Sequence, residues 1–292
     1  MPETLYASFS EPFIKLTKFY MKKNSFVFII LFFQVTMTLA QDNKKSEISL
    51  SFGPAFAIGK FANTDLFNNS SGFAKSGEII SASYLHPFSK NWKFIVNLSG
   101  QRNPINTNAF ETTFSTAKIY QGFTFSSDPD NPPLQTNYAV YPNWHFDKKS
   151  WLLGSLQIGA LRQFSTSGQN KLSPAIKATA GAVYASSPLL KGRSVTDTAT
   201  AVIKQSKSSG IGLIYTIGGG VNYSLTKRVF LFTALDYCGT NSLKFKDIKS
   251  TLTTTKGTFG SPDYSIQQTV ITTEGKQTIS SINLLFGISL VL

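Results

Sequence analysis

The chain has 292 residues, of which 15% are charged and 13% are aromatic, with 25 Phe and 11 Tyr. This composition suits strands better than helices, and a single cysteine excludes an internal disulfide. The formal net charge is +13, but the basic residues are spread along the chain rather than gathered into a nucleic-acid-binding motif.

Residues 21–40 are predicted to form a secretory signal peptide. Basic residues at 22–23 precede an apolar run over 26–33, and small residues lead to a cleavage point after Ala40. A transmembrane helix is the alternative, but Gln34 interrupts the run, which is too short to span a bilayer. Export also argues against nucleic acid as a partner.

The start of the chain is interpreted in two parts. Because a signal peptide normally begins at its basic region, Met21 is the expected initiator and residues 1–20 a misassigned N-terminal extension. The mature domain is then 41–292. It contains no apolar run of the roughly 18 residues that a membrane helix needs, so a membrane-spanning fold would have to be a closed β-barrel.

Three alternating segments, 47–59, 74–85 and 92–102, are predicted as the first strands, each with large apolar side chains on one face. Residues 60–73 are predicted as a loop, and 86–91, which includes His86, as a short turn.

A long connection over 103–150 follows. Its proline-rich part excludes a central strand, whereas 108–120 could be a short helix or an extension of neighbouring strands. A strand pair inside this connection would raise the barrel to ten strands.

Five further strands are predicted, at 151–163, 172–185, 211–225, 229–237 and 278–292. The connections between all eight strands alternate in length. The short ones are 86–91, 164–171 and 226–228, whereas 186–209 and 239–276 are long loops. This asymmetry favours an all-β, eight-stranded antiparallel transmembrane barrel with long external loops over a soluble β-sandwich.

Several stretches carry a family resemblance: SLSFGPAFAIGKF, AKSGEIISASY, WLLGSLQIGAL, GGGVNYSLTKRVFLFTALDY and the closing INLLFGISLVL. They resemble small outer-membrane β-barrel proteins of the OmpA-like superfamily, and are most similar to those of Bacteroidetes-type bacteria. The resemblance covers 41–292 apart from the loops, and implies a cell outer membrane location. It departs at Leu292, where the family usually ends in Phe or Trp.

Eight strands enclose a lumen that side chains can fill, so an open pore is disfavoured. Lys93, Lys177 and Asp236 are the candidate lumen-facing charges, with Phe230 and Phe232 filling space beside them. A structural network is preferred to a proton or substrate path.

No catalytic, cofactor or metal site is predicted. His145 with Asp147 and Ser150 could form a rim enzyme acting on lipid, but adjacency in sequence is no evidence of geometry. Two separated histidines and one cysteine make no metal cluster, and Cys238 is interpreted as a strand-end residue rather than a reactive thiol.

The expected function is that of a non-enzymatic, monomeric envelope scaffold or surface-binding protein acting through its external loops. The alternatives are a narrow channel or a component of an envelope transport or secretion machine. The expected partners are outer-membrane lipid and lipopolysaccharide, which Lys191, Arg193, Lys204 and Lys207 could meet, and a surface protein or polysaccharide.

Overall fold

A computed structural model gives the fold, and all residues it describes lie in the unit Lys44–Leu292. The described residues are 45–65, 68, 70–116, 118–124, 135–140, 142–164, 171–196, 199–256 and 265–292. The predicted extension, the signal peptide and its cleavage point lie outside them.

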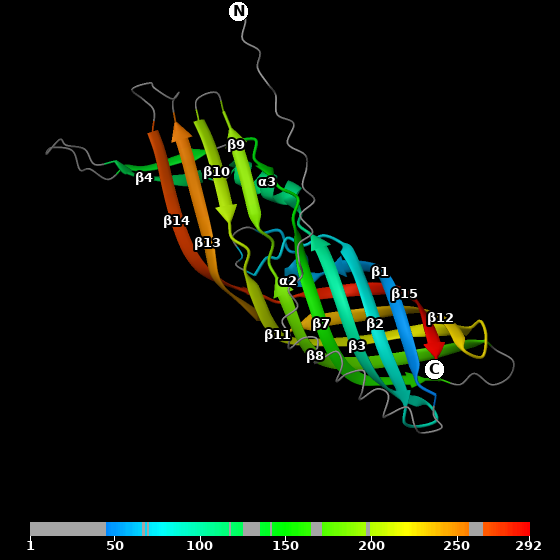
Figure 1. Cartoon of the computed structure of the whole chain (residues 1–292). Coiled ribbons are helices and arrows are strands. Elements are labelled where there is room, and N and C mark those ends of the chain that lie inside the picture. The colour runs from blue at the N-terminus through cyan, green and yellow to red at the C-terminus, as the bar shows by residue number, and fades with distance from the viewer. Residues whose placement is uncertain are drawn as a thin grey trace, which may run out of the picture. The chain divides into compact units, whose positions relative to one another are not determined.

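Eight antiparallel strands close into a barrel in the order β1-β15-β12-β11-β8-β7-β3-β2 (Figure 1). Closure is made by β1, which pairs with both β2 and β15 and sets Glu47 opposite Leu85 and Val291. The strands are β1 (Glu47–Ala57), β2 (Gly77–Pro87), β3 (Trp92–Pro104), β7 (Ser150–Gln163), β8 (Leu172–Ser186), β11 (Ser209–Ser224), β12 (Val229–Thr240) and β15 (Ser280–Val291). The predicted eight-stranded barrel is confirmed.

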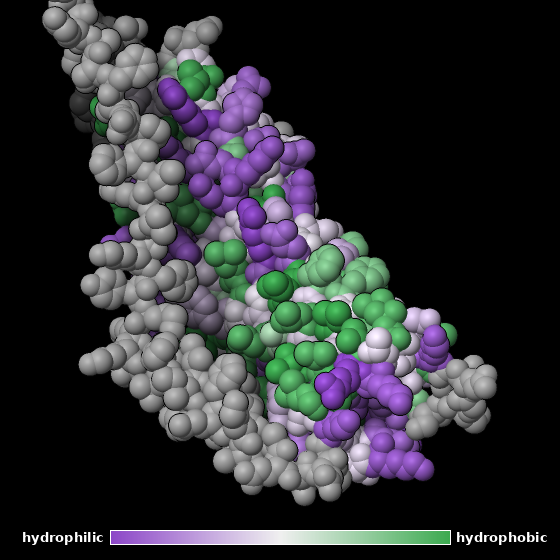
Figure 2. Space-filling view, turned by 45° about the vertical axis from the view of Figure 1, so that its right-hand side comes forward, coloured by the Kyte–Doolittle hydropathy of each residue, from purple (hydrophilic) through white to green (hydrophobic). Residues whose placement is uncertain are grey.

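Large apolar side chains cover the outside of the barrel. Every second residue of β11 projects outward, and Ile211 is 76% exposed, Leu213 66% and Ile217 60%. Figure 2 shows such residues gathered in a band with hydrophilic residues on either side of it. A continuous apolar surface of this kind is stable when lipid covers it, so the barrel is a transmembrane one.

Among the described residues, no helix is both long and apolar enough to cross a membrane. The longest of the described helices is α3 (Thr107–Thr116), which overlaps the stretch 108–120 predicted as a short helix or a strand extension. A single-turn helix, α2 (Gly59–Ala62), follows β1.

The two connections predicted as long loops, 186–209 and 239–276, contain strands, and that prediction is wrong. They form β9 (Leu190–Val195), β10 (Ala199–Gln205), β13 (Leu243–Lys256) and β14 (Ser265–Gln277). With β6 (His145–Phe146) these make a five-stranded sheet in the order β14-β13-β10-β9-β6, which we call the external sheet. The core that covers one face of this sheet supports β9 and β10, and β14 adds to the sheet by backbone pairing with β13.

That core is aromatic and lies partly on α3. Phe73, Phe110 and Phe146 meet there, with ring centroids 4.0 Å apart for Phe73–Phe110 and 5.5 Å for Phe110–Phe146. Phe146 also lies over its cross-strand partner Gly192, where a Cβ would come within 2.4 Å of the ring. The external sheet therefore has a buried face along β6 and β9, whereas β14 is exposed on both faces over most of its length.

A strand pair does occur inside the first long connection, formed by β4 (Lys118–Thr124) and β5 (Gln135–Val140). It is a separate two-stranded sheet and does not enter the barrel. The ten-stranded alternative is therefore wrong, because the barrel closes through β3–β7 pairing over 13 residue pairs and leaves no room for an insertion.

Candidate functional site: the barrel lumen and the external sheet

The lumen is closed at the end that carries the long connections. An apolar core there joins Trp151 and Ile214 of the barrel to Phe245 of β13 and Phe61 of α2. The Trp151 ring meets Phe61 and Phe245 edge-on, with centroids 5.7 Å and 5.6 Å apart, and its Nε1 donates to the Gly72 carbonyl at 2.8 Å. We call this core the plug. Phe61 is 0% and Phe245 2% exposed, so side chains from outside the barrel strands are packed tightly against this end of the lumen.

Below the plug lies a layer of hydrogen-bonded polar side chains. The Gln157 Oε1 accepts hydrogen bonds from the hydroxyls of Thr179 at 2.7 Å and Thr216 at 2.9 Å. The Cys238 Sγ lies 3.1 Å from the Thr216 Oγ1 and accepts from the Asn283 Nδ2 at 3.2 Å. Cys238 is buried and takes part in this network as a structural group.

Next to this layer, an ion pair lies on the inner surface of the barrel and spans one strand. The Lys177 Nζ lies 2.7 Å from the Asp236 Oδ2, and the Asp236 side chain is 4% exposed. The two residues come from β8 and β12, which are not neighbours; Gly218 of β11 lies between them and is the register partner of both. A Cβ on Gly218 would lie 1.9 Å from the Asp236 Oδ1, so the glycine makes room for the pair.

The third predicted lumen charge, Lys93, lies apart from these two. Its Nζ pairs with the Glu47 Oε1 at 2.5 Å, near the end of the barrel that carries the short turns. Glu47 was not predicted as a lumen residue. Its alternation with the buried Ser49 and Ser51 on β1 is the signal that could have placed it there.

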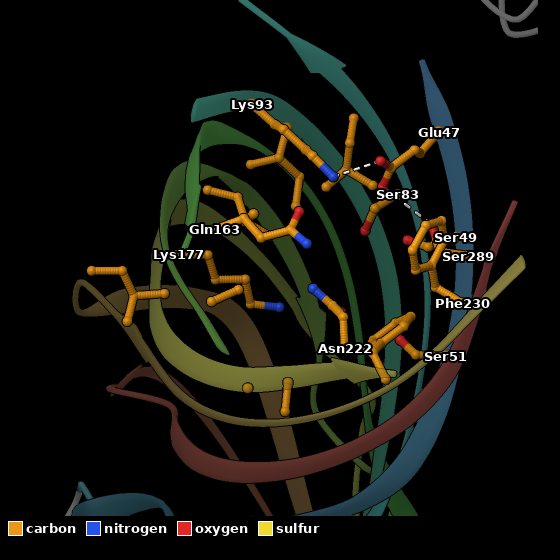
Figure 3. A pocket seen from close by; sticks show the side chains of 18 of the residues that line it. Glu47, Ser49, Ser51, Ser83, Lys93, Gln163, Lys177, Asn222, Phe230 and Ser289 are labelled. Atoms are coloured by element: carbon orange, nitrogen blue, oxygen red, sulfur yellow. Dashed lines mark hydrogen bonds and ion pairs between the residues drawn. The ribbon is translucent and has the colours of Figure 1, made fainter. Parts of the chain in front are cut away.

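Between the two ion pairs lies a cavity of about 120 Å³, to which all eight barrel strands contribute. Figure 3 shows Lys177 and Asn222 pointing into it from β8 and β11, with Gln163 beside them and Phe230 on the β12 side. Phe230 and Phe232 both line the cavity, as expected of lumen-filling residues. The cavity lies in the half of the lumen nearest the short turns, and the plug closes the other half.

The rim residues considered for catalysis do not form a triad. His145 is exposed on β6 and opposite Arg193, and the Ser150 hydroxyl accepts from the Arg102 Nε at 3.2 Å. Within the described residues, no hydrogen bond joins His145 to Asp147 or Ser150, and no three potential metal ligands cluster.

His86 was predicted in a turn, which is wrong. It belongs to β2, because its backbone pairs with Phe94 of β3 and the strand continues to Pro87; its Nδ1 is hydrogen-bonded to the Ser46 hydroxyl at 3.0 Å.

Basic side chains gather on the exposed face of the external sheet. Lys191 and Lys204 are direct cross-strand partners, and Arg193 lies two residues after Lys191 on β9. On its other side Lys204 pairs with Thr251 of β13, and Lys249 lies two residues before Thr251. We call these four residues the basic face. Within the described part of the chain none of them is in an ion pair, and like charges directly opposite each other destabilise a sheet.

A closed ring of eight antiparallel strands, an apolar exterior and a polar interior define a transmembrane β-barrel, here with a plugged lumen and an external sheet. No protein-family model matches the sequence, and no curated protein matches it.

Among solved structures, the chain is similar to Neisserial surface protein A at 13% identity, with 85% of this chain and 97% of that chain covered and a TM-score of 0.41. It is similar to Ail, the attachment invasion locus protein of Yersinia pestis, at 12% identity, with 84% and 98% covered and a TM-score of 0.37. It is also similar to a major outer membrane protein from Thermus thermophilus at 11% identity, with 85% of this chain and 99% of that chain covered and a TM-score of 0.36. Sequence identities and TM-scores this low carry no argument about a site or an activity.

Proposed function

We propose that this chain is a monomeric outer-membrane barrel that acts as a non-enzymatic surface-binding protein, with the external sheet as its binding element. The observation that carries the proposal is the basic face on a sheet that has its own aromatic core. A sheet supported in this way holds the backbone positions of the basic residues in a fixed register, which lowers the entropy lost on binding compared with a loop.

The proposed partners are anionic glycans of the cell surface, lipopolysaccharide included. The Lys191–Lys204 pair costs stability in the free protein, and an anion that lies between the two ammonium groups would offset that cost. The plug argues against the channel alternative, because apolar side chains pack together at the end of the lumen that carries the long connections.

Replacing Lys191 and Lys204 together by Gln is expected to have two opposite effects. Unfolding free energy rises by about 0.2–1 kcal/mol, because a like-charge cross-strand pair is removed. Affinity for purified lipopolysaccharide falls by about 30-fold, from roughly 1 kcal/mol per basic residue near an anionic surface. Urea unfolding in detergent and titration with lipopolysaccharide measure the two effects.

The matched control is the double replacement of Lys90 and Lys227, which are exposed in short turns at the other end of the barrel. It removes the same charge and should leave affinity nearly unchanged. Equal losses of affinity in both double variants would contradict a role for the basic face. Ion conductance through planar bilayers by the unaltered protein would support the channel instead.

A further inference from the structure

A cleft lies between the plug and the aromatic core of the external sheet, and the surface-binding proposal does not use it. Its volume is about 380 Å³. Buried apolar side chains from both cores form its floor, among them Phe73, Phe110, Trp151, Phe245 and Ile248. The plug and the aromatic core are separate clusters, and the cleft is a space that remains between them.

A β-bulge in β13 turns two of the floor residues toward the cleft. Phe245 pairs with Gly275 of β14 and Ile248 pairs with Thr273, so β13 has one residue more than β14 between the two pairs. The extra residue lets Phe245 and Ile248 lie on the same side of the sheet, where both are buried. Asp247, within the bulge, has a φ of 54°. Such backbone strain in a non-glycine residue is concentrated at functional sites, ligand sites included.

Charged groups lie only at the rim of the cleft. Among the described residues that line it, the charged ones are Glu274 and Lys276 of β14, which are exposed and opposite in sign. The floor offers no counter-charge, so an ion on it would lose its hydration without compensation. The occupant that fits the floor is therefore a neutral molecule.

One polar atom of the lining lacks a partner. The Ser71 Oγ is buried, and within the described residues nothing is hydrogen-bonded to it. The Trp151 Nε1, in contrast, already donates to the Gly72 carbonyl. Because a hydroxyl both donates and accepts, a ligand with a single hydroxyl or N–H group could pair with Ser71.

The volume of the cleft sets the size of that ligand. An apolar cavity of about 150 Å³ binds one benzene ring. The cleft, at about 380 Å³, therefore has room for two fused rings. The aromatic side chains of the floor offer ring edges and faces for edge-on or offset stacking.

We propose that the cleft binds a neutral bicyclic aromatic molecule with one hydroxyl or N–H group, of the chemical class of naphthol and indole. The rings lie on the apolar floor, and the polar group meets the Ser71 hydroxyl. The exposed Glu274 and Lys276 at the rim leave an entrance from solvent. No residue of the basic face lines the cleft, so this proposal and the surface-binding proposal can fail independently.

Fluorine NMR of protein labelled with 5-fluorotryptophan tests the proposal, because the chain has three tryptophans in different places. Trp151 lines the cleft, Trp144 belongs to the aromatic core, and Trp92 begins β3 at the end with the short turns. Trp92→Phe and Trp144→Phe assign the resonances. In lipid nanodiscs, 2-naphthol should shift the Trp151 resonance with a Kd on the order of 0.1 mM of free ligand. Trp92, 38% exposed on the barrel, reports partition into lipid and should not respond over this range.

The variant Ser71→Ala tests the polar contact. It should weaken the binding of 2-naphthol about fivefold, because one hydrogen bond is lost. The binding of 2-methylnaphthalene, which has no hydroxyl, should not change.

The variant Thr273→Phe tests the location. Thr273 is an exposed residue of the lining, so an added ring should narrow the cleft and weaken 2-naphthol at least about tenfold while the protein still folds. Thr269→Phe is the matched control. It is the same replacement on the same face of β14, also exposed but outside the lining, and it should change nothing.

The absence of a saturable Trp151 shift in the unaltered protein overturns the proposal, as do equal shifts of Trp151 and Trp92. Binding that Thr273→Phe leaves intact also overturns it, because the ligand would then lie elsewhere. An equal loss of both ligands in Ser71→Ala overturns the assigned hydrogen bond and the ligand class that depends on it.

Discussion

Gly218→Ala is expected to destabilise the folded barrel by about 3–5 kcal/mol, the cost of breaking a buried ion pair. The added Cβ would lie 1.9 Å from the Asp236 Oδ1 and 2.9 Å from the Leu235 carbonyl oxygen, so Asp236 must leave its position. Lys177 and Asp236 can then no longer pair across β11, and the Asp236 carboxylate stays buried without its cation.

The adjacent glycine provides the control. A Cβ on Gly219 would meet nothing closer than the Ala175 carbonyl oxygen at 3.6 Å. The unfolding free energy of Gly219→Ala should therefore be close to that of the unaltered protein. Urea titrations of both variants in the same detergent, with the fraction of folded barrel read from unheated gels, measure the difference. Equal midpoints for the two variants would show that the ion pair does not depend on space at Gly218.

Lys177→Met alone is expected to cost about 3–5 kcal/mol, because it leaves Asp236 buried without its cation. Asp236 depends strongly on this partner: within the described residues its second oxygen, Oδ1, accepts no hydrogen bond. Adding Asp236→Leu should recover most of the loss, since a buried ion pair can be replaced by apolar groups at little cost.

A double-mutant cycle measures this, with the unfolding free energies of the unaltered protein, both single variants and the double variant. A strong positive coupling between positions 177 and 236 is the expected result. If the double variant is as unstable as Lys177→Met, or less stable, the pair is needed for more than charge balance, and the polar layer next to it must depend on Asp236.

The barrel could be predicted from the sequence because each strand carries its own signal. Alternation along β11 separates Ile211, Leu213 and Ile217 from the small residues between them, and a lipid-facing surface makes that contrast strong. The same alternation placed Lys177 and Asp236 on one inner surface. It could not pair them, because their contact depends on the strand order β8-β11-β12 and on a glycine in between.

The external sheet could not be predicted in the same way. On β13, the exposed Lys249 and half-buried Thr251 and Thr253 show no apolar alternation, so the segment has the composition of a loop. Its Leu252 packs against the core of Phe73, Phe110 and Phe146, which lie far away in the sequence. The cavity was missed for a related reason, since its lining combines single residues from all eight strands.

The display of the external sheet on the cell surface is the central claim, and labelling of single cysteines tests it most directly. Cys238 is buried and should contribute little background. Gln268→Cys lies on exposed β14, and Lys227→Cys lies in a short turn at the other end of the barrel. In intact cells, a maleimide that cannot cross membranes should label the cysteine at 268 and reach the one at 227 only after lysis. Labelling of position 227 but not 268 in intact cells would contradict the account.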